Sequence, residues 1–362
     1  MKTFLFILWL SFLSLPFMGI KGSLFLLLGI SLGYSLLIIV RKYSGFLSGI
    51  PLGKEFKPPH IRYDSRLLYA LTLILLLVLP LIVGDYYIDV FILAGIYIIL
   101  ALGLNVVIGF SGLLNLGFAA FYAIGAYTCG LLTTKAGLGF WSSLPMSVFI
   151  ATVSGLILAF PALRLRGDYL AIVTLGAGEI VRLTLNNWDS LTGGPNGISG
   201  IPSPFVFGFE LSKLSHYYYP VLFFVLFTIF IVRRLYYSRT GRAWLALRED
   251  EVAAEAMGIN TTKYKFLAFS FGAFWAGLAG ALFAGKMRFI SPESFTFMES
   301  VFIACMVILG GIGSIPGVIL GALILVILPE VLREFQLYRM LALGIGLVLM
   351  MVFRPQGLWR RG

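Results

Sequence analysis

The sequence predicts an all-α integral membrane protein, a polytopic bundle of about 10–12 transmembrane helices, some of them broken or re-entrant. Three observations predict this fold class. Hydrophobic residues make up 59% of the 362 residues, charged residues make up only 12%, and apolar stretches of helical length recur along the chain. Soluble domains carry about 25% charged residues. So few charges cannot cover the surface of a soluble two-domain enzyme, and that class is excluded.

The apolar stretches locate the helices, because a bilayer core needs about 20 apolar residues per helix. The expected spans lie near residues 3–20, 23–40, 66–83, 89–108, 113–134, 144–163, 169–186, 219–236, 264–284, 299–309, 314–328 and 339–353. Segments 299–309 and 314–328 are short and flank GGIGSIPG, so they form either two thin spans or one re-entrant pair. A close helix-packing seam is predicted by small residues at every fourth position, Ala273, Gly277, Ala281 and Gly285.

The charge balance indicates orientation. The chain has 27 Lys and Arg residues against 16 Asp and Glu residues, and basic residues of membrane proteins collect on the cytoplasmic side. Most of these basic residues fall on one side if the N-terminus is inside. We therefore expect a multi-pass protein of the cytoplasmic (inner) membrane with both termini cytoplasmic, and no nucleic-acid partner. The apolar run after Lys2 lacks a small-x-small cleavage site, so we expect a retained helix rather than a signal peptide.

Catalytic motifs are missing from the sequence. No G-x-x-x-x-G-K-[ST] phosphate loop occurs, and the glycine-rich stretch TGGPNGISGIP (192–202) lacks the lysine of a nucleotide cradle. His60 and His216 have no metal-ligand spacing, and Cys129 and Cys305 lie in expected spans as small apolar side chains. We therefore expect no enzymatic activity in the chain itself, no metal and no cofactor.

Glu179 and Arg182 are ionisable residues within an expected span, which makes them candidates for function. Their spacing of three residues places them on one helical face, where they can pair. One interpretation is an ion pair that fixes helix packing, and the other is contact with a zwitterionic solute. Thr174, on the same expected helix, is a further candidate for a residue of the translocation path.

The segment LGLNVVIGFSGLLNLGFAAFYAIGAYT (102–128) places Asn105, Ser111 and Asn115 among several glycines. In a membrane this pattern is typical of a broken helix whose freed amides and carbonyls face a cavity for a small polar solute. The alternative is a helix contact in which the polar side chains bond to neighbouring backbone. The sequence favours neither, and the three residues are candidates for the path.

The longest informative loop is RRLYYSRTGRAWLALREDEVAAEAMGINTTKYK (233–265). Asp250 is expected to cap a short helix that has Glu251 in its first turn and Gly258 at its end. Thr261 or Thr262 is expected to cap the next span. A short helix with small side chains fits a groove on another protein, so we interpret the loop as a docking element rather than a solvated connection.

Five ordered motifs carry a resemblance to a known family. They are the 102–128 segment, LRLRGDYLAIVTLGAGEIVRLTLNN with TGGPNGI, GRAWLALREDEVAAEAMGI, ISPESFTF followed by VILGGIGS, and the closing FRPQGL. Together they resemble the permease subunits of branched-chain amino-acid ABC importers, most closely the LivM type. The resemblance covers residues 66–358, and residues 1–65 fit by pattern as extra helices with a basic loop. It implies a permease domain over residues 66–362.

The resemblance also implies partners: a LivH-like permease subunit, two cytoplasmic ABC ATPase subunits, an extracytoplasmic solute-binding protein, a small-molecule amino acid (Leu, Ile or Val) and membrane lipid. The loop at about 237–263 would contain the helix that docks on the ATPases, although the run that ends at Gly258 departs from the family pattern E-A-A-x-x-x-G. The residues expected to couple to the ATPases are Arg248, Glu249, Asp250, Glu251, Glu255, Ala256 and Gly258. Two alternatives stay open, a permease for urea or short amides in a similar importer and an ion-driven secondary transporter.

Overall fold

The structure is a computed structural model that describes residues 76–80, 83–162, 165, 167–206, 209–210 and 213–331, together with 344, 348 and 357–359. Its contacts divide the chain into two units, Met1–Leu76 with Pro329–Arg339, and Leu77–Leu328 with Met340–Gly362. Nearly all described residues belong to the second unit. The expected spans at 3–20, 23–40 and 339–353, and most of 66–83, lie outside the described residues.

The described part of the chain is mainly helical. Its α-helices are α3 Asp85–Leu104, α4 Phe118–Thr134, α5 Phe140–Ala162, α6 Asp168–Asn187, α7 Asp189–Thr192, α8 Leu214–Tyr236, α9 Arg239–Glu249, α10 Glu251–Ala256, α11 Thr261–Met287, α12 Phe297–Gly310 and α13 Ile315–Val331. A π-helical turn, η2 (Asn105–Phe110), continues α3, and two 3-10 turns are η3 Gly194–Asn196 and η4 Pro292–Phe295. The strands are β1 Ile198–Ser199, β2 Phe205–Val206, β3 Phe209–Glu210 and β4 Phe289–Ile290.

Four described helices are long and apolar enough to cross a membrane: Asp85–Phe110, Phe140–Pro161, Leu214–Tyr236 and Thr261–Met287. They confirm the expected all-α membrane fold. Helix α6 covers the expected span 169–186 but does not reach this apolarity, because Glu179 and Arg182 interrupt its apolar residues. Helix α4 begins at Phe118, later than the expected start of the span 113–134, because the preceding residues are not helical.

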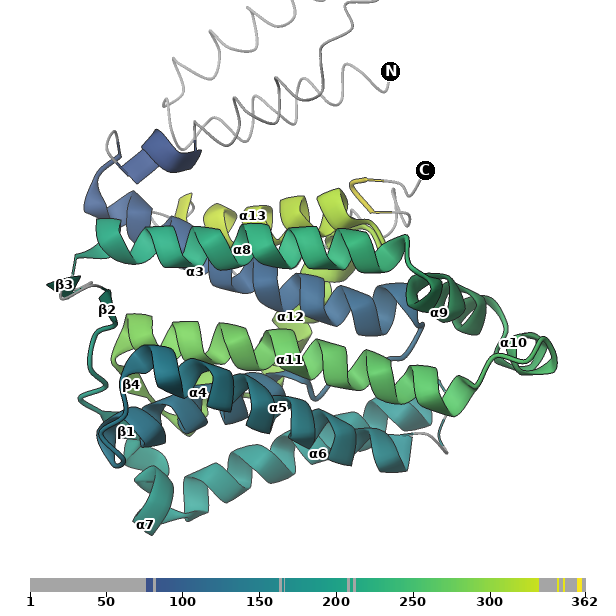
Figure 1. The fold of residues 1–362 in the computed structure, drawn as a ribbon, viewed down its shortest axis with the longest axis horizontal. Coiled ribbons are helices and arrows are strands. Elements are labelled where there is room, and N and C mark those ends of the chain that lie inside the picture. Colours follow the sequence, from purple (N-terminus) through teal and green to yellow (C-terminus); the bar gives the residue numbers. More distant parts are fainter. Residues whose placement is uncertain are drawn as a thin grey trace, which may run out of the picture. The chain divides into compact units, whose positions relative to one another are not determined.

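Helix α11 is the centre of the packing. It contacts α3, α4 and α5, and Figure 1 shows it between α3 and the α4–α5 pair. Its small residues form the expected seam: a Cβ added to Gly277 would lie 2.5 Å from the Cβ of Ala151 on α5. Gly125 on α4 approaches Gly277 equally closely, since its added Cβ would lie 2.5 Å from the Gly277 Cα. Only side chains this small allow three helix backbones to meet here.

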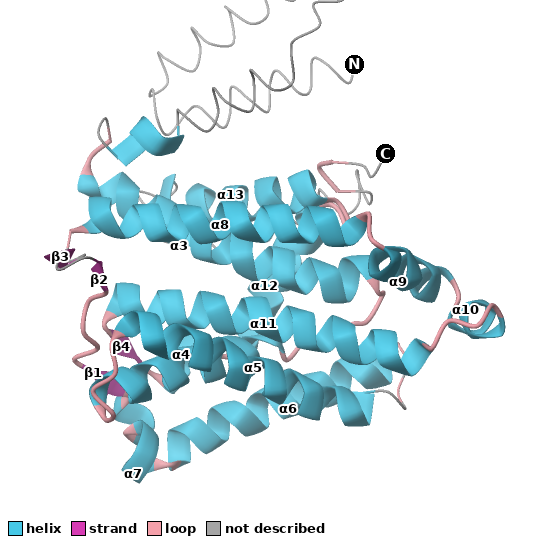
Figure 2. Ribbon diagram, in the orientation of Figure 1, coloured by secondary structure: helices cyan, strands magenta, loops and turns pink. Residues whose placement is uncertain are grey.

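The short elements gather at two ends of these helices. Figure 2 shows the strands at one end and α9 and α10 at the other. Strand β1 pairs antiparallel with β4, Ile198 opposite Ile290, and β2 pairs antiparallel with β3, Phe205 opposite Glu210. The β1–β4 pair ties the glycine-rich 192–202 loop to the chain that follows α11.

Helices α12 and α13 are joined by a short turn, residues 311–314, and pack closely together beside it to form a hairpin. An added Cβ on Gly321 would lie 3.0 Å from the Gly310 Cα, and Gly317 also lies against Gly310. At 1.5 Å per residue the helices are about 21 and about 26 Å long, each shorter than a hydrocarbon core of about 30 Å. The hairpin therefore agrees with the expected short pair, whether it spans the membrane twice or re-enters it.

Candidate functional site

The first candidate region is the interrupted segment, residues 111–117, between η2 and α4. Helix α3 continues through η2 to Phe110, and the chain is then non-helical until α4 begins at Phe118. Gly112 adopts a φ of +73°, which other residues rarely adopt, and this turn ends the helix. The helix is therefore interrupted within 102–128, which is the feature that the first of the two interpretations of this segment expected.

Polar side chains of this region bond to backbone. The Oδ1 of Asn105 accepts from the Gly313 N–H at 2.9 Å, the Oγ of Ser111 donates to the Val107 carbonyl at 2.7 Å, and the Oδ1 of Asn115 accepts from the Gly117 N–H at 3.0 Å. All three side chains are buried. They supply hydrogen-bond partners to backbone around the point where the chain leaves the helical pattern. The Nδ2 atoms of both asparagines have no hydrogen-bond partner in the described structure.

Two other helices bond to the backbone at the start of α4. The Oγ1 of Thr174 on α6 accepts from the Leu116 N–H at 3.1 Å and donates to the Ala171 carbonyl at 2.9 Å. The Oγ of Ser300 on α12 accepts from the Ala119 N–H at 2.9 Å. Sequence reasoning named Thr174 but missed Ser300, because nothing local to residue 300 indicates a partner so far away in the chain.

A small pocket lies where these elements meet. It is lined by the start of α4 (Leu116, Gly117, Ala119, Ala120), by α6 (Leu175, Gly178, Glu179) and by Phe295, Thr296, Phe297 and Ser300. Its volume of about 10 Å³ has room for roughly one water molecule. Both α4 and α12 begin at this pocket, so the positive ends of two helix dipoles face it together with one carboxylate.

Glu179 and Arg182 form the pair that their spacing predicts. The Arg182 Nε lies 2.8 Å from the Glu179 Oε2, and their side chains keep 27% and 30% of their surface exposed. The structure thus brings Glu179, Thr174 and Asn115 to the start of α4. Asn105 and Ser111 lie at the other end of the interrupted segment, beside Gly313 and Val107. The six candidate path residues therefore divide into two groups.

The second candidate region is the α9–α10 segment, Arg239–Ala256. Ser238 caps α9 by accepting from the Gly241 N–H, and the Oδ1 of Asp250 caps α10 by accepting from Val252 at 2.8 Å and Ala253 at 3.0 Å. Gly258 ends α10 with a φ of +81° and a bond from its N–H to the Glu255 carbonyl at 2.9 Å. The predicted cap and stop are confirmed.

The tip of this segment presents apolar side chains to solvent. Val252 is 62% exposed and Met257 is 83% exposed, and Glu249, Glu255 and Ala256 are exposed around them. Ala254 faces inward and is buried. Exposed apolar groups rimmed by charge are typical of a surface that another protein covers.

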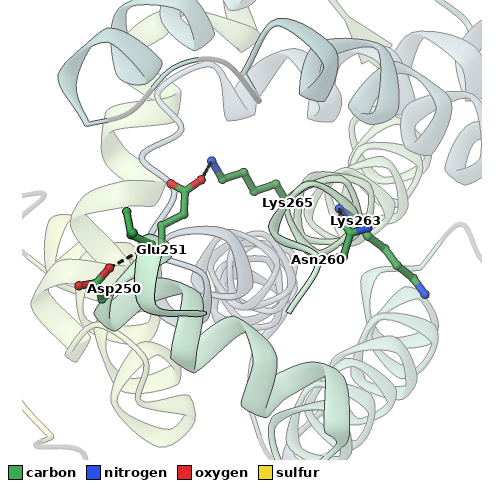
Figure 3. Close-up of polar contacts among 6 residues, drawn as sticks. Asp250, Glu251, Asn260, Lys263 and Lys265 are labelled. Atoms are coloured by element: carbon green, nitrogen blue, oxygen red, sulfur yellow. Dashed lines mark hydrogen bonds and ion pairs between the residues drawn. The ribbon is translucent and has the colours of Figure 1, made fainter. Parts of the chain in front are cut away.

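Two contacts fix the segment to α11. The Nε1 of Trp244, which is 1% exposed, donates to the Tyr264 carbonyl at 2.8 Å. The Nζ of Lys265, also buried, lies 2.7 Å from the Glu251 Oε1, and Figure 3 shows the two side chains reaching toward each other. The expectation that Thr261 or Thr262 caps α11 was wrong. Asn260 is the cap, because its Oδ1 accepts from the Lys263 N–H at 2.9 Å.

Arg248 points away from the exposed tip. Its Nη1 donates to the Gly109 carbonyl at 2.7 Å, at the end of η2, whereas the neighbouring Glu249 and Asp250 are exposed. Among the described residues no group of three or more His, Cys, Asp and Glu side chains is placed to hold a metal ion. The two regions therefore offer hydrogen bonds, one ion pair close to a pocket, and an anchored surface helix.

Comparison with known proteins places this geometry in context. The family described as the permease component of the branched-chain amino acid transport system matches residues 86–353. The high-affinity branched-chain amino acid transport system permease protein LivM of Escherichia coli (strain K12) is 48% identical over 317 residues, 81% of this chain and 75% of that protein.

More distant relatives match at similar length. The probable branched-chain amino acid transport permease protein LivM of Methanocaldococcus jannaschii is 26% identical over 314 residues, 73% of this chain and 90% of that protein. The permease protein LivH of Escherichia coli (strain K12) is 29% identical over 296 residues, 74% of this chain and 92% of that protein. No solved structure matches the chain.

Proposed function

Because this chain belongs to the family of permease components of branched-chain amino acid transport systems, we propose that it forms half of the translocation pathway of an ATP-driven importer for Leu, Ile and Val. The other half is a LivH-like permease subunit. Two cytoplasmic ABC ATPase subunits supply the energy, and an extracytoplasmic solute-binding protein delivers the amino acid. The chain lies in the cytoplasmic membrane with both termini on the cytoplasmic side.

The observation that carries the proposal is the anchored α9–α10 segment. Its tip exposes Val252 and Met257, which an ATPase groove would cover, while the Glu251–Lys265 ion pair fixes its base to α11. Helix α11 in turn packs on α3, α4 and α5. A displacement of α10 is therefore transmitted to the helices that surround the path. In this way a permease can use ATP that its partner ATPases hydrolyse.

The pocket at the start of α4 is our candidate for contact with the solute. An amino acid carries an ammonium and a carboxylate. Glu179 lines the pocket, and its ion-pair partner Arg182 lies three residues further along α6, so the pair offers a partner for each. The starts of α4 and α12 add positive dipole ends, an arrangement that transporters use to bind carboxylates. The described pocket holds only about one water, so alternating access would have to open it before an amino acid entered.

Two variants test the docking role. Gly258→Ala strains the end of α10, since a residue with a Cβ costs about 1–2 kcal/mol at this positive φ. Glu251→Ala with Glu255→Ala removes the carboxylate that anchors the base of the segment to Lys265 and an exposed carboxylate near its tip. We expect leucine uptake by the assembled importer to fall about tenfold while membrane insertion and ATP hydrolysis persist. Gly200→Ala is the matched control, with a φ of +74° and open space around it, at the opposite end of the helices. Unchanged uptake in the tip variants would count against docking.

The same assay separates the substrates and energy sources. Unlabelled isoleucine or valine should compete with labelled leucine, whereas urea should not. Uptake that survives complete ATP depletion and stops with an uncoupler would indicate an ion-driven transporter instead.

A further inference from the structure

The end of the first long helix is capped by a residue from the α9–α10 segment. The last carbonyls of a helix have no partner within the helix and carry its negative dipole end. Here the guanidinium of Arg248 bonds to the Gly109 carbonyl at 2.7 Å. The Arg248 stem packs on the turn that follows, since a Cβ added to Gly112 would lie 3.0 Å from the Arg248 Cγ. The Arg248 side chain from α9 thus contacts both the last turn of η2, at Gly109, and the turn after it, at Gly112.

The same helix end touches the break in the α12–α13 hairpin. Asn105, one turn before Gly109, accepts from the Gly313 N–H at 2.9 Å. Gly313 lies between α12 and α13 and has a φ of +85°. Gly109 itself leaves no free space at this contact, because an added Cβ would lie 2.7 Å from the Gly313 nitrogen and closer still to Asn105. The helix end at η2 is therefore bonded both to Arg248 and to the break between α12 and α13.

We propose that Arg248 is a positioning residue that transmits movement of the α9–α10 segment to both interrupted helices, through Gly109 and Asn105. The inference rests on the proposed function, because it takes the segment to be what the ATPases move. Arg248 suits this role better than a docking role, since its guanidinium is held on backbone inside the chain. A hydrogen bond from a charged donor is among the stronger ones in proteins. When α9 moves, the bond from Arg248 can therefore move the end of η2 together with α9.

Arg242 provides a matched control on the same helix. It is exposed, carries the same charge, and its Nη1 donates to the Tyr237 carbonyl at the end of α8 at 3.0 Å. Arg242→Ala therefore removes an equal charge without touching either break.

The test uses the complete importer in proteoliposomes: this chain, its partner permease, both ATPases and the binding protein loaded with labelled leucine. Three quantities are measured for Arg248→Ala, Arg248→Lys, Asn105→Ala, the Arg248→Ala/Asn105→Ala double variant and Arg242→Ala. They are the amount of ATPase that co-purifies, the rate of ATP hydrolysis and the leucine transported per ATP. Loss of a hydrogen bond from a charged donor shifts the equilibrium between two states by about tenfold or more, if only one of the states makes the bond.

We expect Arg248→Ala to keep the ATPases and their hydrolysis while transport per ATP falls about tenfold. Asn105→Ala should cause a similar loss, the double variant little more than either, and Arg248→Lys a smaller loss because a cationic donor remains. Arg242→Ala should transport normally. Normal transport per ATP in Arg248→Ala, or additive losses in the double variant, would overturn the proposal that Arg248 and Asn105 transmit the movement together. If Arg248→Ala lost the co-purifying ATPases, Arg248 would be a docking residue and the proposed function would still hold. If no ATPase co-purified with the unaltered chain, the proposed function itself would be contradicted.

Discussion

Replacement of Gly277 by alanine should separate the helices that meet at the centre of the bundle. The new Cβ would lie 2.5 Å from the Ala151 Cβ, 3.2 Å from the Ser147 carbonyl oxygen and 3.3 Å from the Val148 Cα. Non-bonded carbons prefer about 3.5–4.0 Å, so the helices must part by about 1 Å. Overpacking of this kind costs about 1–3 kcal/mol. The higher helix propensity of alanine returns about 0.5–1 kcal/mol, which leaves a net loss of about 2 kcal/mol or less.

The free energy of unfolding in detergent micelles measures this loss. Gly176→Ala on α6 is the matched control, because nothing lies within 4 Å of its added Cβ, and it should be neutral or slightly stabilising. Ala151→Gly combined with Gly277→Ala should recover part of the loss, since the Ser147 and Val148 contacts remain. If Gly277→Ala proved as stable as Gly176→Ala, the close packing of α11 on α5 would be refuted.

Two further predictions concern charged pairs. Glu251→Ala should lower the free energy of unfolding by about 1.5–3 kcal/mol, because it leaves the buried Lys265 ammonium without this carboxylate. Glu251→Gln should lower it less, because an acceptor remains. Equal losses in both variants would argue against the ion pair. Arg182→Ala should change the free energy of unfolding by less than about 1 kcal/mol, since the Arg182–Glu179 pair is part-exposed. It should nevertheless reduce leucine uptake several-fold if the pair contacts the solute, and unchanged uptake would leave the pair a packing contact.

Features of the chain that depend on neighbouring residues could be predicted from the sequence. The apolar stretches gave the long helices, Asp250 and Gly258 marked the ends of α10, and the spacing of Glu179 and Arg182 predicted their ion pair. The ion pair and each cap depend on residues within about one turn of each other, where helical geometry alone fixes the distance, and the long helices require only a continuous apolar stretch. Hydrophobic periodicity and capping chemistry are sufficient at this range.

Contacts between distant parts of the chain could not be predicted. Arg248 bonds to Gly109, and Ser300 bonds to Ala119, across separations that only the packing of several helices decides. The cap of α11 also escaped prediction. Asn260 and the two threonines that follow it are all good caps, and only the extended backbone at Asn260 selects it.

The most direct test of the account measures ATP hydrolysis and leucine uptake with the purified chain alone and then with its partners added. The chain alone in proteoliposomes should hydrolyse no ATP and accumulate no leucine. Addition of the partner permease, the ATPases and the binding protein should produce uptake that requires ATP and requires this chain. ATP hydrolysis by the isolated chain, or ATP-driven uptake by the other components without it, would contradict the claim that this chain forms half of the path and that the ATPases supply the energy.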